Sequence, residues 1–148
     1  ICVGDLADRA ALRAELAARP RHLDLSLVLY SYQLHPSIIH HIDCCDEVYF
    51  WTWDAAHLLK LQQNFETYQR IAPGKRTLLG IYMWDFGGKK PIPIELMEHQ
   101  CRLGLQWMRE GKIEGMIFHC TPLCDMNLEA VEWSRKWIDR HADDVVRS

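Results

Sequence analysis

The chain has 148 residues, of which 49% are hydrophobic and 25% charged, and its formal net charge is −3 at pH 7. This length favours one domain with a core of its own, and the composition is that of an ordinary globular protein. The mildly acidic charge excludes a basic footprint for nucleic acid or for an anionic membrane. No apolar run approaches the roughly 20 residues that span a bilayer. We therefore expect neither nucleic acid nor a membrane as a partner.

Strand and helix signals alternate from the beginning of the chain. Asp5 or Asp8 can cap a first helix, which Pro20 ends. The next apolar run is continuous, as is typical of a buried parallel strand, and Pro36 fits the first turn of a short helix. The predicted elements of this half are a helix over 9–18, a strand over 25–32, a short helix over 36–42 and a strand over 48–53.

The second half continues the alternation. A helix before Pro73 places Leu58, Leu61, Phe65, Tyr68 and Ala72 on one face, at a spacing near 3.6 residues. The further elements are a strand over 77–84, a loop over 87–90, a helix from Pro93 to Gly111, a strand over 113–119 and a helix over 128–141. Alternating strands and helices predict an α/β fold with a parallel sheet.

The six cysteines do not suggest a disulfide framework. Cys44 and Cys45 are adjacent, Cys101 falls within a predicted helix, and Cys120 ends an apolar strand. Free cysteines in such places behave as small hydrophobic residues, and disulfides are rare in reducing compartments. We therefore expect free thiols and a reducing compartment such as the cytoplasm.

Two strand ends repeat each other. Trp51-Thr52-Trp53-Asp54 closes one apolar run and Tyr82-Met83-Trp84-Asp85 closes another, 31 residues later, and a helical pattern follows each. This spacing matches the roughly 31 residues per unit of an eight-unit (β/α)8 barrel, whose strand ends build the active site. With Tyr30–Gln33 and Ile113–Cys120, these segments resemble the C-terminal half of a glycoside-hydrolase-like (β/α)8 protein.

The resemblance implies a TIM-barrel portion of about strands four to eight. The chain begins at Ile1 with strand-like residues, as expected of a piece excised from a longer protein. The alternative is an open doubly wound sheet, which usually binds its ligand through a glycine-rich first turn. The first turn, from Gly4 to Asp8, lacks the G-x-G-x-x-G pattern, so we favour the barrel portion.

The resemblance also implies a pair of catalytic carboxylates, Asp5 and Asp85. Glycoside hydrolysis needs one protonated and one ionised carboxyl group, and in the barrel clan these groups follow the fourth and seventh strands. That clan normally carries Glu at both positions, whereas this chain carries Asp. The alternative is structural: Asp5 caps a helix and Asp85 accepts hydrogen bonds from loop amides.

Candidate substrate-binding residues lie at the same strand ends. Aromatic rings stack on the apolar faces of sugars, while carboxylates and other polar groups bind the hydroxyls. Side chains alternate along a strand. If Asp54 points into the barrel, Trp51 and Trp53 therefore face the surrounding helices. If Asp85 points into the barrel, its neighbour Trp84 points outward. The candidates are Asp54, Trp53, Trp84, Tyr32, His35 and His119.

These observations favour a carbohydrate-active protein. They leave open whether it is an enzyme. One alternative is a non-catalytic barrel segment that binds a ligand or completes a larger domain. Another is a metal-dependent barrel hydrolase or isomerase, with His35, His119, Cys120, Asp54 and Asp85 as the metal ligands, although no metal-binding spacing supports such a site. We expect a carbohydrate or other small polar ligand and no cofactor. Because half a barrel leaves unpaired strand edges, we also expect it to pair with a missing N-terminal half or with itself.

Overall fold

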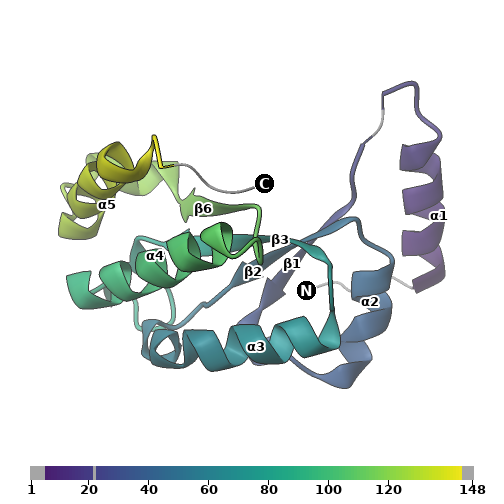
Figure 1. Cartoon of the computed structure of the whole chain (residues 1–148), viewed down its shortest axis with the longest axis horizontal. Coiled ribbons are helices and arrows are strands. Elements are labelled where there is room, and N and C mark those ends of the chain that lie inside the picture. Colours follow the sequence, from purple (N-terminus) through teal and green to yellow (C-terminus); the bar gives the residue numbers. More distant parts are fainter. Residues whose placement is uncertain (1–5, 22, 145–148) are drawn as a thin grey trace.

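The computed structural model describes residues 6–21 and 23–144, which form a mixed α/β structure (Figure 1). The helices are α1 (Leu6–Ala17), α2 (Ile39–Asp43), α3 (Leu61–Ile71), α4 (Ile94–Arg109) and α5 (Glu129–His141). The strands are β1 (Ser26–Tyr30), β2 (Glu47–Trp51), β3 (Arg76–Tyr82), β4 (Trp84–Asp85), β5 (Lys90–Pro91) and β6 (Gly115–His119). Four short 3-10 helices are η1 (Ser31–Gln33), η2 (Pro36–Ile38), η3 (Ala55–Lys60) and η4 (Thr121–Asp125).

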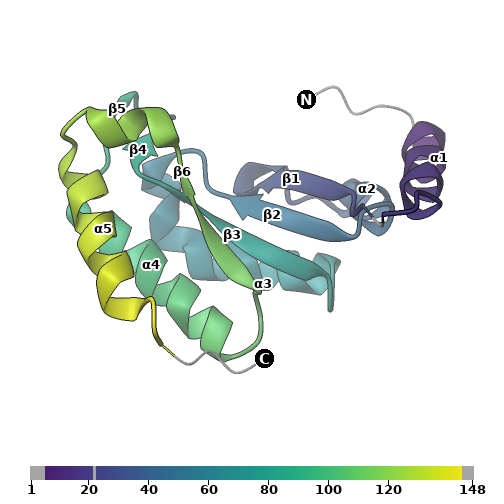
Figure 2. The same cartoon turned by 90° about the horizontal axis from the view of Figure 1, so that it is seen from above.

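The main sheet has four parallel strands in the order β1-β2-β3-β6, which confirms the predicted α/β class (Figure 2). Neighbours in the sheet therefore follow one another along the chain, apart from the short β4–β5 ribbon. A doubly wound sheet reverses its strand order at a switch point. The described strands show no such reversal.

Several predicted strand ends differ from the observed ones. The strand predicted over 25–32 stops at Tyr30, because η1 turns the chain and Gln33 Oε1 accepts a hydrogen bond from Tyr30 N at 2.9 Å. The predicted loop over 87–90 is partly extended, since Lys90–Pro91 pairs antiparallel with Trp84–Asp85. Both differences arise from local pairing at the ends of strands.

One face of the sheet, called the helix face, carries the core. Leu29, Phe50 and Leu79 are neighbours in register and are almost fully buried. Helices α3 and α4 run along this side of the sheet (Figures 1 and 2). Phe50 packs on Phe65 and Tyr68 of α3, with ring centroids 5.9 and 5.1 Å away. This packing supplies most of the apolar burial that holds the fold together.

The opposite side, called the open face, carries the alternate residues of the same strands. Val28 is 44% exposed, and Tyr49, Leu78 and Ile117 are half-buried. None of these four side chains belongs to the core of the helix face. One side of the sheet is therefore largely covered by helices, whereas the described residues leave part of the other side accessible.

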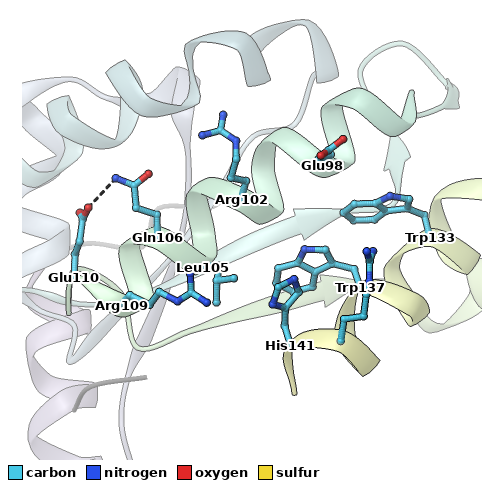
Figure 3. Close-up of a pocket in the computed structure, with 10 residues that line it drawn as sticks. Glu98, Arg102, Leu105, Gln106, Arg109, Glu110, Trp133, Trp137 and His141 are labelled. Carbon is cyan, nitrogen blue, oxygen red and sulfur yellow. Dashed lines mark hydrogen bonds between the residues drawn. The ribbon is translucent and has the colours of Figure 1, made fainter. Parts of the chain in front are cut away.

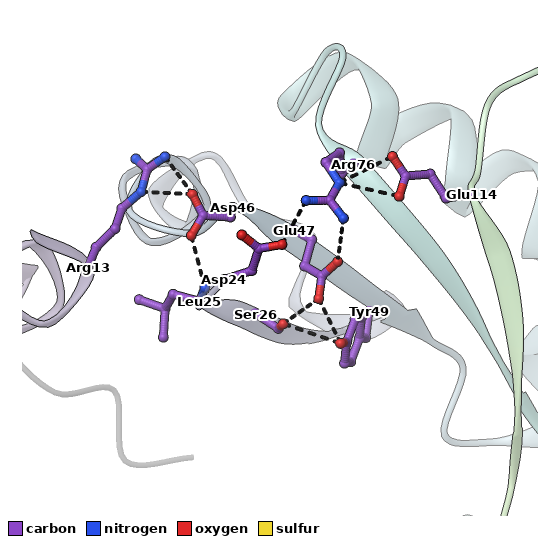
Figure 4. A network of polar contacts seen from close by, with 9 residues as sticks. All are labelled: Arg13, Asp24, Leu25, Ser26, Asp46, Glu47, Tyr49, Arg76 and Glu114. Atoms are coloured by element: carbon purple, nitrogen blue, oxygen red, sulfur yellow. Dashed lines mark hydrogen bonds and ion pairs between the residues drawn. The ribbon is translucent and has the colours of Figure 1, made fainter. Parts of the chain in front are cut away.

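A polar network closes the N-terminal end of the open face (Figure 4). Buried Glu47 accepts hydrogen bonds from Ser26 Oγ at 2.6 Å and Tyr49 OH at 2.7 Å. Arg76 reaches Glu47 at 3.4 Å, and it also binds Asp24 at 2.9 Å and Glu114 at 3.2 Å. Its hydrogen bonds to the Asp24 and Glu114 carboxylates raise the pKa of Arg76. The network ties β1, β2 and β3 together at their starts.

Two further features complete the fold. Arg13 of α1 pairs with Asp46 at 2.7 Å, and Asp46 also accepts a hydrogen bond from Leu25 N. The five cysteines in the described ranges, Cys44, Cys45, Cys101, Cys120 and Cys124, carry free thiols. No helix in these ranges is both long and apolar enough to cross a membrane.

Candidate functional site

Aromatic side chains gather where the strands end on the open face. They come from β1, β2, β3 and β6 and from the loops that follow the first three, and their rings contact one another as neighbours. This aromatic cluster consists of Tyr30, Tyr32, Trp51, Trp53, Tyr82, Phe86 and His119. Ligands of parallel α/β sheets bind outside the carboxyl ends of the strands, so the cluster lies at the end where a site is expected.

The floor of the cluster is Trp51 with Tyr82. The Trp51 indole lies across Gly80, where an added Cβ would come within 2.0 Å of the ring. Trp51 and Tyr82 pack with their centroids 4.7 Å apart, and both are buried. Trp51 Nε1 has no hydrogen-bond partner among the described residues. A buried N–H without a partner carries a desolvation cost.

The outer part of the cluster exposes two ring systems. Tyr32 is 62% exposed and Trp53 is 41% exposed. Tyr30 supports both: it stacks on Tyr32 at 5.4 Å with a 6° interplanar angle, and it meets Trp53 edge-on at 5.9 Å. The exposed rings are therefore held by neighbours before any ligand arrives, which lowers the entropy cost of binding.

Polar groups lie between the rings. The hydroxyl groups of Tyr30 and Tyr82 are 3.5 Å apart. Burial, and then the hydrogen bond with Tyr30, raise the pKa of Tyr82 above its ordinary value. The exposed His119 imidazole meets Tyr82 and Trp51 edge-on at 5.3 and 5.7 Å. The cluster thus offers both stacking surfaces and hydrogen-bonding groups.

Asp85 is buried and binds backbone amides. Its Oδ1 accepts hydrogen bonds from Ala55 N at 3.1 Å and from Gly88 N at 2.9 Å. A Cβ at Gly88 would lie 2.3 Å from Asp85 Oδ2, so this glycine allows the close approach. Asp85 therefore joins the loop after β2 to the loop after β3, as the structural alternative from the sequence described.

The other predicted carboxylates have different surroundings. Asp54 accepts a hydrogen bond from Ala56 N at 2.9 Å and caps η3. Its side chain packs on Gly87, where an added Cβ would come within 2.8 Å. Gly87 N donates to Trp53 O at 3.2 Å, which fixes the loop beside the exposed indole. The predicted partner Asp5 lies outside the described residues, so the proposed carboxylate pair stays a prediction.

The remaining predicted site residues divide into two groups. Tyr32, Trp53 and His119 lie together in the aromatic cluster. Trp84 is half-buried against the core of the helix face, and exposed His35 caps η2 through Ser37. The sequence-based list omits Tyr30, Trp51, Tyr82 and Phe86. The register that aligns Tyr30 with Trp51, and Tyr82 with His119, would have found three of these.

A separate groove lies between α4 and α5 on the outside of the fold (Figure 3). It encloses about 550 Å³ and includes Trp133 and Trp137, whose rings stack 6.4 Å apart. Some of its charges are paired: Arg109 and His141 both bind Asp144 at 2.8 Å. Hydrogen bonding from His141 lowers the pKa of Asp144. We favour the aromatic cluster as the candidate site, because it lies outside the carboxyl ends of the parallel strands, where ligands of such sheets bind.

The described residues contain no recognisable metal-binding site. In residues 6–21 and 23–144, no group of three or more His, Cys, Asp or Glu side chains is placed to hold a metal ion.

Comparison with known proteins gives no assignment either. No protein-family model, no curated protein and no solved structure matches this chain. Its function must therefore be argued from the geometry of the site.

Proposed function

We propose that the aromatic cluster binds a glycan and that the chain is part of a carbohydrate-active (β/α)8 protein. The observation that carries the proposal is the pair of exposed rings, Tyr32 and Trp53, held over a buried floor of Trp51 and Tyr82. Sites for sugars combine flat apolar surfaces with a few fixed polar groups. The cluster has both, at the end of the sheet where such sites lie.

The expected binding mode follows from these groups. A sugar ring lays its apolar face on Trp53 or Tyr32, which are the exposed rings. Its hydroxyl groups then reach the Tyr30 and Tyr82 hydroxyls or the His119 imidazole, which border the same cluster. Burial of the stacked face gives affinity, and the hydrogen bonds select the orientation of the hydroxyls.

The barrel part of the proposal rests on topology. The strands are parallel, follow chain order in the sheet and carry α3 and α4 on one side. A (β/α)8 barrel has this arrangement in every part of its wall. An earlier strand, which the proposed numbering places before α1, falls on residues 1–5, outside the described residues.

The described hydrogen bonds favour binding over hydrolysis as the role of these residues. A glycosidase needs two carboxyl groups facing the scissile bond, roughly 5–10 Å apart. Asp85 is buried and already accepts two amide hydrogen bonds. Hydrolysis by Asp85 with Asp5 is the second candidate, supported by their predicted places after two strands.

The first test is a titration with a panel of oligosaccharides, followed by calorimetry. Trp53→Ala and Tyr32→Ala remove one exposed ring each, and we expect each to weaken binding about 5- to 150-fold, as loss of about 1–3 kcal/mol of stacking implies. Trp133→Ala is the matched control, because it removes a tryptophan from the α4–α5 groove. Equal affinity in all three variants would contradict the proposal.

The second test separates binding from hydrolysis. Asp85→Ala leaves two loop amides without their acceptor, so we expect it to lower the free energy of unfolding by about 1–3 kcal/mol. Asp85→Asn keeps one oxygen acceptor and should cost less, with glycan affinity retained. If Asp85 is instead catalytic, Asp85→Asn abolishes glycan turnover and leaves the melting temperature nearly unchanged.

A further inference from the structure

We propose that Asp85 is a positioning residue, whose buried carboxylate holds the two loops that present Trp53 and Phe86 in the aromatic cluster. The expected effect of Asp85 on ligand affinity rests on the proposed function, whereas its expected effect on the rings does not. The proposal also gives a role to the aspartates of the repeated strand ends, Trp53-Asp54 and Trp84-Asp85, which stacking of a sugar leaves unexplained.

The carboxylate of Asp85 joins two loops of the site. The loop after β2 carries Trp53, and the loop after β3 carries Phe86. Asp85 Oδ1 accepts hydrogen bonds from Ala55 N in the first loop at 3.1 Å and from Gly88 N in the second at 2.9 Å. Asp85 is only 3% exposed, and hydrogen bonds are stronger away from water. One oxygen atom therefore fixes the backbone just beyond each of the two rings.

A second set of contacts joins the same loops closer to the rings. Gly87 N donates a hydrogen bond to Trp53 O at 3.2 Å, and an added Cβ at Gly87 would meet the Asp54 side chain. The rings of Trp53 and Phe86 are neighbours, with centroids 5.3 Å apart and an interplanar angle of 31°. The two rings are therefore placed by the contact between the loops, and Asp85 holds the buried end of that contact.

Trp53 depends on this support because much of its side chain is exposed. The ring is 41% exposed, and Tyr30 and Tyr82 meet it only edge-on, at centroid distances of 5.9 and 6.0 Å. Without the bonds to Asp85, the backbone beside Trp53 and Phe86 gains freedom. A ligand that stacks on Trp53 must then order the ring as it binds, and this ordering lowers the affinity.

The two glycines allow the loops to approach this closely. An added Cβ at Gly88 would meet Asp85 Oδ2, as one at Gly87 would meet Asp54. Glycine is the residue that permits such close contact. Gly88→Ala therefore displaces the Asp85 carboxylate while it keeps every polar group of the two loops.

The first measurement is the mobility of the Trp53 ring without any ligand, from ¹⁵N relaxation of its indole N–H group. We expect an order parameter of about 0.85 in the wild type and below about 0.6 in Asp85→Ala. Asp85→Asn keeps an oxygen acceptor and should restore the rigid value. Glu47→Ala is the matched control, because it removes a buried carboxylate at the opposite end of the strands and should leave Trp53 rigid.

The second measurement is the affinity for the tightest-binding member of the oligosaccharide panel. Asp85→Ala should weaken binding about 2- to 12-fold, as the ordering of one mobile side chain implies. In a Trp53→Ala background, Asp85→Ala should weaken binding little further, because the ring that Asp85 positions is gone. A merely structural role of Asp85 predicts the same additional loss in both backgrounds.

The outcomes separate this proposal from the proposed function. Gly88→Ala should give the same two changes as Asp85→Ala, and it replaces that variant if Asp85→Ala does not fold. A rigid Trp53 in the folded variants would overturn the proposal, as would equal loosening of Trp53 in Glu47→Ala or additive losses of affinity. If the wild type binds no oligosaccharide, the proposed function fails, and the mobility of Trp53 alone decides whether Asp85 positions the ring.

Discussion

The two faces of the sheet are built from alternate residues of the same strands, and they behave differently. On the helix face, Leu29 and Phe50 are fully buried against helices. On the open face, their neighbours Val28 and Trp51 belong to no helix-covered core; Val28 is exposed, and Trp51 is buried only beneath other aromatic rings. The difference shows that alternate residues of one strand have very different surroundings, a covered core on one face and exposed or aromatic neighbours on the other.

The open face itself changes character along its length. Its N-terminal end is fixed by charge, through Glu47 and Arg76. Its C-terminal end is fixed by rings, through Trp51 and Tyr82. The exposed aromatic rings, Tyr32 and Trp53, lie at the second end. Stability and access to ligand therefore vary along the strands as well as across the sheet.

The largest expected effect compares neighbours on β1. Leu29→Ala removes a fully buried side chain from the helix face and should lower the free energy of unfolding by about 2–5 kcal/mol. Val28→Ala, at an exposed position, should cost about 0.5 kcal/mol or less in the single chain. Urea unfolding at low protein concentration measures both. Equal losses would show that the two faces are not distinct.

A smaller effect compares two glycines on the open face. Gly80→Ala would push its methyl group into the Trp51 ring, so overpacking should cost about 1–3 kcal/mol. Gly115→Ala meets only Leu78, at an ordinary distance of 3.8 Å, and should change stability by about 0.5 kcal/mol or less. Thermal unfolding checks both variants. Indistinguishable melting temperatures would argue against the contact between Trp51 and Gly80.

The smallest effect concerns pH and the helix face. Burial raises the pKa of Tyr68 to about 12 from its usual 10, although a hydrogen bond with Thr77 opposes the rise. The stability that this group contributes is complete below pH 10 and is lost as the pH rises through 12.

Tyr68→Phe should therefore flatten the loss of stability across this alkaline range. The substitution also removes one hydrogen bond, at a cost of about 0.5–1.5 kcal/mol at neutral pH. Thr77 keeps its bond to Lys75 O at 2.8 Å, so no second group is left unpaired. Urea unfolding at several pH values measures the slope, and an unchanged slope would mean that Tyr68 does not titrate differently on folding.

The sequence predicted most of the fold, because apolar periodicity reports burial directly. The helix stripe with Leu61, Phe65 and Tyr68 is buried as expected. The parallel sheet follows from the alternation of strands and helices. The ends of strands were less predictable: Tyr30 stops β1 because Gln33 binds its amide, a contact that no periodicity encodes.

The structure brings together some of the candidate site residues and separates others. Tyr32, Trp53 and His119 lie in one cluster, but Trp84 and His35 do not. Alternation alone could not decide which face Trp51 occupies, because the inference depended on where Asp54 points. The structure places Phe50 among the helices and Trp51 on the open face, while Asp54 leaves the strand to cap η3. The hydrogen bonds of Asp85 join loops that are distant in the sequence. The spacing of residues along the chain therefore could not predict them.

The most direct test of glycan binding is an NMR titration that follows the indole N–H signals of the six tryptophans. Adding an oligosaccharide identified by the panel should move the signals of Trp53 and Trp51, since these belong to the aromatic cluster. The signals of Trp133 and Trp137, in the α4–α5 groove, should stay in place. Movement of Trp133 and Trp137 alone, or of no tryptophan while calorimetry reports binding, would contradict the assignment of the site.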